Sequence, residues 1–272
     1  MDRVRAFVRR EAVLVVAAVL ALASCALVPP DAAYAGYIDW HTLALLFCLM
    51  AVVAGFRSLG VLDAAGAWLV SRATSQRQVA FALVGLAFFA SMAVTNDVAL
   101  ITFVPLALVT IRAAGMEGRL CAIATLMTVA ANLGSMFLPI GNPQNLYLFT
   151  SSGMPFPDFV LLMLPYTALS GALLALAVAV CFPGAPCDGG GRATGEKASS
   201  WRDHPARLAA YAALFCLCVL AVAGLADVRV ALAATVALVA LMDAALFRRV
   251  DYALLLTFVA LFVFVGNMAR VP

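Results

Sequence analysis

Three consecutive polar residues, Thr95-Asn96-Asp97, interrupt an apolar stretch that runs from Val79 to Ile111. A carboxylate is costly inside a bilayer unless it lines a cavity or holds an ion. The interruption leaves arms of about fifteen and fourteen residues, each ~22 Å long as a helix, which is short for a full crossing. We therefore expect a re-entrant helical hairpin, at about residues 79–111, that enters from the cytoplasmic side and places its tip deep in the membrane.

The tip of such a hairpin is suited to ion binding. The first arm ends in free carbonyl oxygens, which suit a cation, and the second begins with free N–H groups, which suit an anion. The alternative is a tight extracellular turn between two short, complete spans. In that case Asp97 is an ordinary N-cap for a helix that starts at Val98. Capping and ion binding by Asp97 are compatible.

A second group of polar residues interrupts another apolar passage, between Ala131 and Asn145. Its two glycines and two prolines lie within ten residues and cannot all sit in one continuous helix. We expect the helix that begins at Leu120 to end near Asn132 to Gly134.

A new helix is then expected to begin with Asn142 as its N-cap and Pro143 as its first residue. This pattern is typical of a discontinuous transmembrane helix, here at about residues 120–149. Its unwound backbone and its Asn, Ser and Gln side chains can replace the hydration shell of an ion. The alternative is an external loop between two unrelated short helices.

The composition requires a lipid bilayer around these segments. Of the 272 residues 65% are apolar and only 11% are charged, and the mean hydropathy is +1.06. Strand-type alternation is absent, so helices are the consistent way to bond every backbone amide in lipid. The sequence predicts an all-α polytopic protein with about seven or eight membrane passages.

Basic residues fall on alternate short loops, as the positive-inside rule requires, with the lone Arg229 as the exception. Arg3, Arg5, Arg9 and Arg10 precede the first span, which predicts a cytoplasmic N-terminus. Arginines flank both outer ends of the predicted hairpin, whereas residues 150–158 contain no Lys or Arg. Besides the hairpin and the broken helix, the spans are expected at about residues 12–27, 41–56, 159–182, 208–225, 230–247 and 252–265.

The one long polar stretch, residues 184–206, predicts a flexible cytoplasmic linker because it is rich in Gly and Ser. It separates a first transmembrane repeat, residues 1–183, from the start of a second, residues 207–272. The repeat rests on a short similarity between residues 38–40 and 250–252, each an apolar residue, an Asp and an aromatic residue before an apolar helix. The topology places the first Asp outside and the second inside, so the two copies would insert in opposite directions.

Two segments carry a resemblance to a known superfamily. SMAVTNDVALITFVPLAL (Ser91–Leu108) and ANLGSMFLPIGNPQNLYL (Ala131–Leu148) resemble the hairpin tip and the broken helix of the ion transporter superfamily. Its members include divalent anion:sodium symporters, citrate-type permeases and arsenite-antimonite permeases. The resemblance implies inverted repeats whose tips meet near the midplane to hold substrate and, in many members, sodium. It also implies elevator-like movement against a scaffold that often dimerises.

The resemblance further implies which residues form a half-site. Asn96, Asp97 and Asn132 would form a sodium half-site, with sodium as coupling ion and no other cofactor. Pro139 would help to shape the second half-helix. The implied substrate- and ion-binding residues are Thr95, Asn96, Asp97, Asn132, Gly134, Ser135, Gly141, Asn142, Pro143 and Asn145.

The chain departs from the superfamily pattern in two ways. Symporters commonly have Ser-Asn-Thr at the tip and this chain has Thr-Asn-Asp, so sodium or proton coupling stays open, with Asp97 able to carry a proton. No second hairpin or broken helix follows Val265. We therefore expect the second repeat to be truncated, as in a fragment or one of two polypeptides. Such a chain would hold half a site, would need a second polypeptide or a homodimer partner, and would not transport alone.

Other classes of protein have little support. The sequence contains no Ser-His-Asp set, HExxH motif, P-loop or paired catalytic acids, so an enzyme is not expected. The net charge of +3 relates to membrane orientation and indicates no nucleic-acid partner. His41 and His204 are not expected to be ligands. Arg57 is expected to anchor its helix at the membrane interface.

The sequence thus favours secondary active transport of a small anion, a di- or tricarboxylate or an oxyanion, across the cell membrane. The coupling ion would be sodium or a proton. Two alternatives stay open: a cation:proton antiporter of the same superfamily that uses Asp97, and a non-transporting membrane subunit or scaffold. Neutral Asn and Ser side chains and helix ends serve many anions, so the sequence does not select one.

Overall fold

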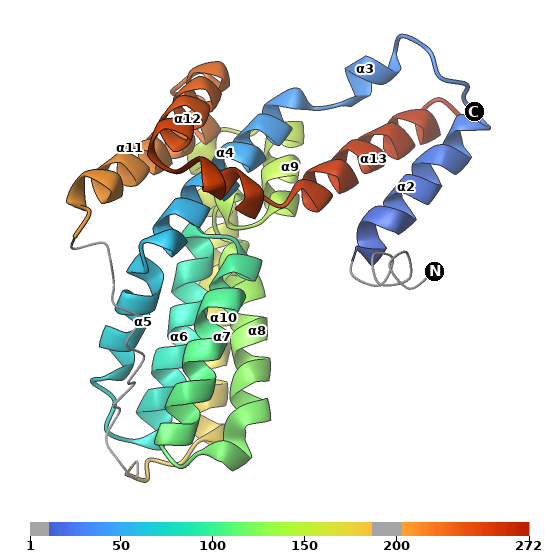
Figure 1. The fold of residues 1–272 in the computed structure, drawn as a ribbon. Helices are drawn as coiled ribbons and strands as arrows, with labels where there is room; N and C mark the ends of the chain where they lie inside the picture. Colours follow the sequence, from blue (N-terminus) through green and yellow to red (C-terminus); the bar gives the residue numbers. More distant parts are fainter. Residues whose placement is uncertain (1–10, 187–202, 272) are drawn as a thin grey trace, which may run out of the picture.

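Helices account for all the regular structure of the residues that the computed structural model describes, 11–186 and 203–271 (Figure 1). Several are short turns that link longer helices. In chain order they are α2 (Ala12–Cys25), α3 (Tyr34–Tyr37), α4 (Trp40–Ser58), α5 (Val61–Val70), α6 (Gln76–Ala93), α7 (Asn96–Ala113), η1 (Glu117–Arg119), α8 (Leu120–Ser135), η2 (Pro139–Gly141), α9 (Pro143–Ser152), α10 (Phe156–Cys181), α11 (Pro205–Val222), α12 (Val228–Asp243), η3 (Ala244–Arg249) and α13 (Tyr252–Met268).

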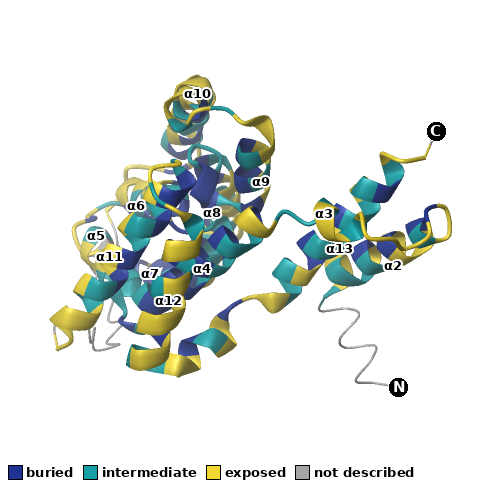
Figure 2. Cartoon of the chain, turned by 90° about the horizontal axis from the view of Figure 1, so that it is seen from above, coloured by how far each residue is buried: buried dark blue, intermediate teal, exposed yellow. Residues whose placement is uncertain are grey.

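The helices form two packed groups that meet near the middle of the molecule (Figure 1). The hairpin bundle consists of α5, α6, α7, α8 and α10, and its core includes Leu83, Phe103 and Met127. The α4 bundle consists of α4, α9, α11 and α12, and its core includes Leu45 and Tyr211. Figure 2 shows that burial is confined to the faces that the helices turn toward one another.

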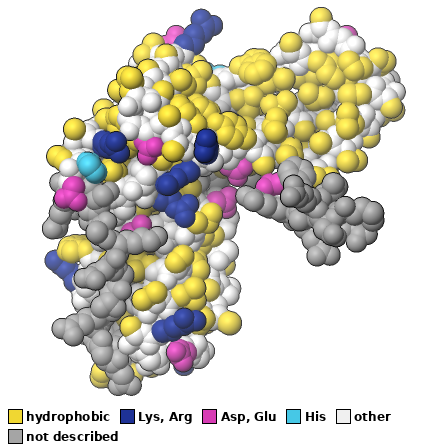
Figure 3. Space-filling view, viewed as in Figure 1, with side chains coloured by type: hydrophobic (Ala, Val, Ile, Leu, Met, Phe, Trp, Pro, Cys, Tyr) yellow, Lys and Arg dark blue, Asp and Glu magenta, His cyan; other side chains and the backbone are white. Residues whose placement is uncertain are grey.

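The outer faces of these helices are apolar. On α10, for example, Leu161, Leu169 and Val180 are more than half exposed, and Figure 3 shows apolar side chains over most of the α2–α13 pair. Six described helices are long and apolar enough to cross a membrane: α4, α6, α7, α10, α11, and α12 together with η3. A surface of this kind suits hydrocarbon rather than water. The chain is an all-α, multi-pass membrane protein, as the sequence predicts.

The predicted hairpin is formed by α6 and α7, and each arm has 18 residues. The predicted arm lengths of about fifteen and fourteen were too short, because the helices continue through polar residues at their outer ends. Length and composition alone would let each arm cross a membrane. However, α10 has 26 residues and extends ~39 Å, against ~27 Å for each arm. The hairpin tip therefore stops well short of the far end of α10.

Hydrogen bonds place the outer ends of the hairpin beside the C-terminal end of α10. The Arg77 Nε donates to the Phe182 carbonyl at 2.9 Å, and the Gln76 N–H donates to the Ala185 carbonyl at 3.0 Å. At the start of α8, Arg119 donates to the Cys181 carbonyl at 3.4 Å. Arginines thus gather at one end of the bundle, as the topology prediction requires. The N-terminal arginines and residues 187–202 of the predicted linker lie outside the described residues.

The two short segments on which the predicted repeat rests, residues 38–40 and 250–252, have the same local geometry. Asp39 caps α4 by accepting from the Thr42 N–H at 3.0 Å, and Asp251 caps α13 by accepting from the Leu254 N–H at 2.9 Å. Their backbone angles are φ −77°, ψ 87° and φ −80°, ψ 85°. The two helices run in opposite directions in both Figure 1 and Figure 2. This is the arrangement that an inverted repeat requires, and the rest of the second repeat stays a prediction.

Polar contacts hold α13 against α2 and the loop that follows it. The buried amide of Asn267 donates to the Ser24 hydroxyl at 2.9 Å and to the Tyr34 hydroxyl at 2.8 Å. Arg270 pairs with Asp31 at 2.8 Å, and this guanidinium holds the pKa of the Asp31 carboxyl below its usual range. The C-terminal end of α13 is therefore fixed against α2 and the loop that follows it.

The closest helix contact in the hairpin bundle depends on Gly134. A Cβ at this position of α8 would overlap the Phe88 carbonyl oxygen of α6 and touch the Ser91 hydroxyl. Small residues let helix backbones approach in this way. The contact brings the C-terminal end of α8 to the level of the hairpin tip.

We expect Gly134→Ala to destabilise the protein by about 1–3 kcal/mol, because α6 and α8 must separate to admit the methyl group. The matched control is Gly85→Ala on α6, where a Cβ would meet nothing within 4 Å. Thermal unfolding of the purified protein in detergent measures both. Equal midpoints for the two variants would show that the close contact is absent.

Candidate functional site

The hairpin tip consists of two extended residues, Val94 and Thr95. Their ψ angles are 156° and 152°, and α7 begins immediately after them at Asn96 with Thr95 as its N-cap. The alternative role of Asp97 as N-cap of a helix that starts at Val98 is therefore wrong, whereas a turn between two complete spans stays open, since both arms are long enough to cross a membrane. No side chain caps α7, so its first N–H groups can bind a ligand.

An amide pair fastens the tip to the end of α8. The Asn96 Nδ2 donates to the Asn132 Oδ1 at 3.0 Å, and the Asn132 Nδ2 donates to the Thr128 carbonyl at 2.9 Å. The structure thus brings together two residues of the predicted sodium half-site. Their amides bond to each other on an exposed face, while the third residue, Asp97, faces elsewhere.

The break between α8 and α9 is held by three polar side chains. α8 ends at Ser135, and α9 begins at Pro143 with Asn142 as its cap, which confirms the predicted cap and first residue. The Asn142 Oδ1 accepts from the Asn145 N–H at 2.7 Å, and the Asn142 Nδ2 donates to the Ser135 hydroxyl at 3.1 Å. The Asn145 amide donates to the Met136 carbonyl at 2.7 Å. These bonds link the two half-helices across the break. They favour a discontinuous helix over the alternative of an external loop between two unrelated helices.

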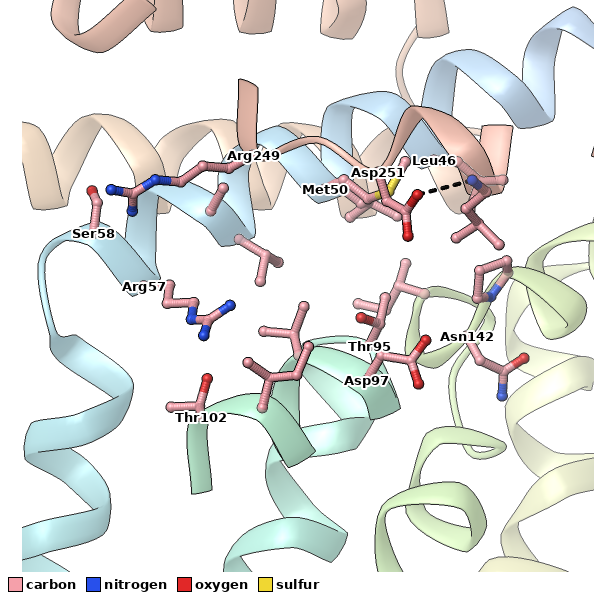
Figure 4. Close-up of a pocket in the computed structure, with 18 of the residues that line it drawn as sticks. Leu46, Met50, Arg57, Ser58, Thr95, Asp97, Thr102, Asn142, Arg249 and Asp251 are labelled. Atoms are coloured by element: carbon pink, nitrogen blue, oxygen red, sulfur yellow. Dashed lines mark hydrogen bonds between the residues drawn. The ribbon is translucent and has the colours of Figure 1, made fainter. Parts of the chain in front are cut away.

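A cavity of about 930 Å³ lies where the two bundles meet (Figure 4). Its wall is formed by α4, the N-terminal half of α7, the break from η2 into α9, and the segment that leads into α13. Four predicted site residues line it: Thr95, Asp97, Asn142 and Pro143. The predicted site residues that do not line it are Asn96, Asn132, Gly134, Ser135, Gly141 and Asn145.

The predicted residues outside the cavity support its wall. Ser135 and Asn145 are buried and bond across the break. Gly134 permits the contact between α6 and α8, and a Cβ at Gly141 would overlap the Ser135 carbonyl oxygen. In this structure these side chains and glycines therefore hold the backbone in place instead of pointing at the cavity.

Most of the charge on the cavity wall was not anticipated from the sequence. Besides Asp97, the charged lining residues are Arg57, Asp63, Arg249 and Asp251. In Figure 4 the carboxylates of Asp97 and Asp251 point toward each other from opposite walls. Within residues 11–186 and 203–271, no three His, Cys, Asp or Glu side chains are grouped to hold a metal ion.

Arg57 was expected to anchor its helix at the membrane interface rather than to bind substrate, and the structure places it on the cavity wall. It belongs to the last turn of α4, and its guanidinium projects into the cavity (Figure 4). Gly60, with φ 70°, then turns the chain into α5, whose N-terminal turn supplies Asp63 to the same wall. In the sequence Arg57 is a lone arginine in the final turn of an apolar helix. That pattern is the same for an arginine at the membrane interface and for one that lines a cavity.

Comparison with known proteins agrees with this architecture. A family model described as Citrate transporter matches residues 3–271. The chain belongs to the citrate transporter family. This membership confirms the resemblance to the ion transporter superfamily, and a family of membrane transporters fits a cavity built from a helical hairpin and a helix break.

The individual relatives of this chain are also named as transport or membrane proteins. Inner membrane protein YbiR of Escherichia coli (strain K12) is 37% identical over 54% of this chain and 39% of its own length. An uncharacterized transporter of Methanocaldococcus jannaschii is 33% identical over 47% of this chain and 36% of its own. Silicon efflux transporter LSI3 of Oryza sativa subsp. japonica is 34% identical over 62% of this chain and 34% of its own. The matches therefore span less than half the length of these relatives.

Replacing Asn142 by Ala should destabilise the protein by about 1 kcal/mol, because α9 loses its cap. Asn142→Asp keeps the capping oxygen and should retain most of that stability, although it loses the donor to Ser135. The exposed neighbour Gln144, changed to Ala, is the control. Thermal unfolding in detergent should rank Asn142→Ala lowest. A midpoint for Asn142→Ala equal to that of the Gln144 control would contradict this account of the break.

Proposed function

We propose that the protein is part of a secondary active transporter that moves a small anion, a di- or tricarboxylate or an oxyanion, across the cell membrane. One observation carries the proposal: the hairpin tip, the helix break and two arginines all meet at one cavity of about 930 Å³. Membership of the citrate transporter family and the transporter names of relatives support the same class of function.

Two helix ends favour an anion in this cavity. The first turn of α7 contributes Thr95 and Val98 to the wall, and the start of α9 contributes Asn142 and Pro143. The N-terminus of a helix carries a partial positive charge and unpaired N–H groups, which attract anions. Arg57 and Arg249 add full positive charges to the same cavity.

The facing carboxylates of Asp97 and Asp251 support coupling to a cation. Two negative charges that point toward each other repel, and a proton or a sodium ion between them removes that repulsion. This pair also favours the second candidate, a cation:proton antiporter. A sodium flux driven by a pH gradient and independent of any anion would select the antiporter.

The position of the cavity supports an elevator-like mechanism. The cavity lies between the hairpin bundle and the α4 bundle, so movement of one bundle against the other would carry its contents. Gly60 has φ 70°, in the left-handed region, at the direct link between α4 and α5. We place the arginine-rich end of the hairpin bundle, with the N-terminus, on the cytoplasmic side of the cell membrane.

We propose that a second repeat, from another polypeptide or from a homodimer partner, completes the site. The Asn96–Asn132 amide pair is at the level of the tip and yet exposed, as a surface that receives a second repeat would be. Proteoliposomes that contain the 272-residue chain alone should therefore show only background uptake of labelled citrate and succinate. Uptake by the chain alone, above that of empty vesicles, would contradict the half-site.

In an assembly that transports, Asp97→Asn and Asp251→Asn should each reduce cation-driven anion uptake by about tenfold or more, which corresponds to ~1.4 kcal/mol of lost cation binding. Asp158→Asn, in the first turn of α10 and outside the cavity, is the control. Sodium gradients and pH gradients applied separately identify the coupling ion. Unchanged uptake in both cavity variants would favour a non-transporting role for this chain or a site elsewhere.

A further inference from the structure

Arg57 carries a positive charge on the cavity wall and has no direct partner in the described part of the chain. No hydrogen bond or ion pair joins its side chain to residues 11–186 or 203–271. Elsewhere Arg77, Arg119 and Arg207 donate to main-chain carbonyls and Arg270 pairs with Asp31, whereas the two arginines on the cavity wall, Arg57 and Arg249, have no such partner among the described residues. Arg57 is exposed and lines the cavity, so its guanidinium is free to bind a ligand of opposite charge there.

Thr102 presents a second unmet group on the same wall. Only 5% of the residue is exposed, yet its hydroxyl has no hydrogen-bond partner among the described residues. Some other helical threonines donate to the carbonyl four residues earlier, as Thr128 does at 2.9 Å and Thr257 at 2.8 Å, whereas Thr110 and Thr235 are unpaired like Thr102 but do not line the cavity. The Thr102 hydroxyl instead points into the cavity toward the side on which Arg57 projects (Figure 4). A buried, unpaired hydroxyl of this kind indicates a missing partner.

The charges on the cavity wall are separated into two ends. Figure 4 shows Arg57, Arg249 and Thr102 on one side of the view, and the carboxylates of Asp97 and Asp251 on the other. A guanidinium and a hydroxyl are both hydrogen-bond donors, so their common ligand is an acceptor with negative charge. Carboxylate and tetrahedral oxyanion groups match the planar donor fork of arginine.

We propose that Arg57 and Thr102 form an anion subsite, in which the guanidinium and the hydroxyl hold one carboxylate or oxyanion group of the substrate. Arg249, on the same side, favours anions that carry two charges. The proposal rests on the proposed function and adds a place for the anion on α4 and the middle of α7, apart from the tip and the break. It also makes Arg57 and Thr102 determinants of anion selectivity.

Protection of Arg57 from phenylglyoxal tests the subsite in the intact chain. The purified protein is labelled in detergent with citrate, succinate, inorganic phosphate or acetate, with ionic strength matched by sodium chloride. Mass spectrometry of a digest then gives the labelling rate of each arginine. Citrate, succinate or phosphate should slow labelling of Arg57 by about tenfold, with acetate weaker. Arg72, which stacks on Trp68 outside the cavity, is the internal control and should show no protection.

A matched pair of variants tests the hydroxyl. Thr102→Val removes it with little change in shape, and Thr110→Val does the same on the same helix, where the Thr110 hydroxyl is also buried and unpaired but does not line the cavity. Thr102→Val should raise the anion concentration needed to protect Arg57 by about tenfold. Thr110→Val should leave it unchanged.

Thermal unfolding of the wild-type chain with the same anions separates the two levels of the proposal, because a ligand that binds the folded state raises the midpoint. Stabilisation together with selective protection of Arg57 supports the subsite. Stabilisation without protection, or equal effects of the two valine variants, overturns the subsite and leaves the proposed function standing. If no anion stabilises the chain and none protects Arg57, the subsite fails, whereas the proposed function fails only if the assembly that transports shows no anion uptake.

Discussion

Backbone amides freed inside a membrane must find partners within the protein, and this constraint determines how the site is built. The hairpin tip and the break in α8–α9 both interrupt helical hydrogen bonding among apolar helices. Amide side chains compensate at the break: Asn145 donates to the Met136 carbonyl, just beyond the end of α8, and Asn142 caps α9. Several polar residues that the sequence suggests as ligands therefore make hydrogen bonds that stabilise the interrupted backbone. What they leave unsatisfied, chiefly the first N–H groups of α7, is what a ligand can use.

The close approach of α6 and α8 follows from the same need. The hydrogen bond between the side-chain amides of Asn96 and Asn132 can form only if the hairpin tip and the end of α8 are at the same level. Gly134 allows this because it has no side chain where the Phe88 carbonyl lies. Packing inside the hairpin bundle therefore fixes the position of α7 and of the break, which together form one wall of the cavity.

The elements of the site could be predicted from local sequence, but the cavity could not. Asn142 and Pro143 carry an N-cap signature that works over a few residues, so the start of α9 was predicted correctly. At the tip the alternative interpretation named Asp97 as the N-cap, but Thr95 holds that position. The helix α5 was missed because its 10 residues are too few for a membrane span. Arg57, Thr102 and Asp251 meet only through tertiary packing of segments far apart in the chain, which no local pattern encodes.

The sign of the charge on the cavity wall bears on coupling. Two arginines and three aspartates line it, so with all of them ionised the wall is slightly negative as a whole although one end is positive. An anion that enters alone increases this negative charge at membrane depth, where uncompensated charge is most costly. A proton or sodium ion at the aspartate end offsets the added charge, so each ligand lowers the cost of admitting the other. Binding of anion and cation is then favourable together and unfavourable singly. That is the thermodynamic condition that the proposed symport requires, and the separation of Arg57 from Asp97 within one cavity is compatible with it.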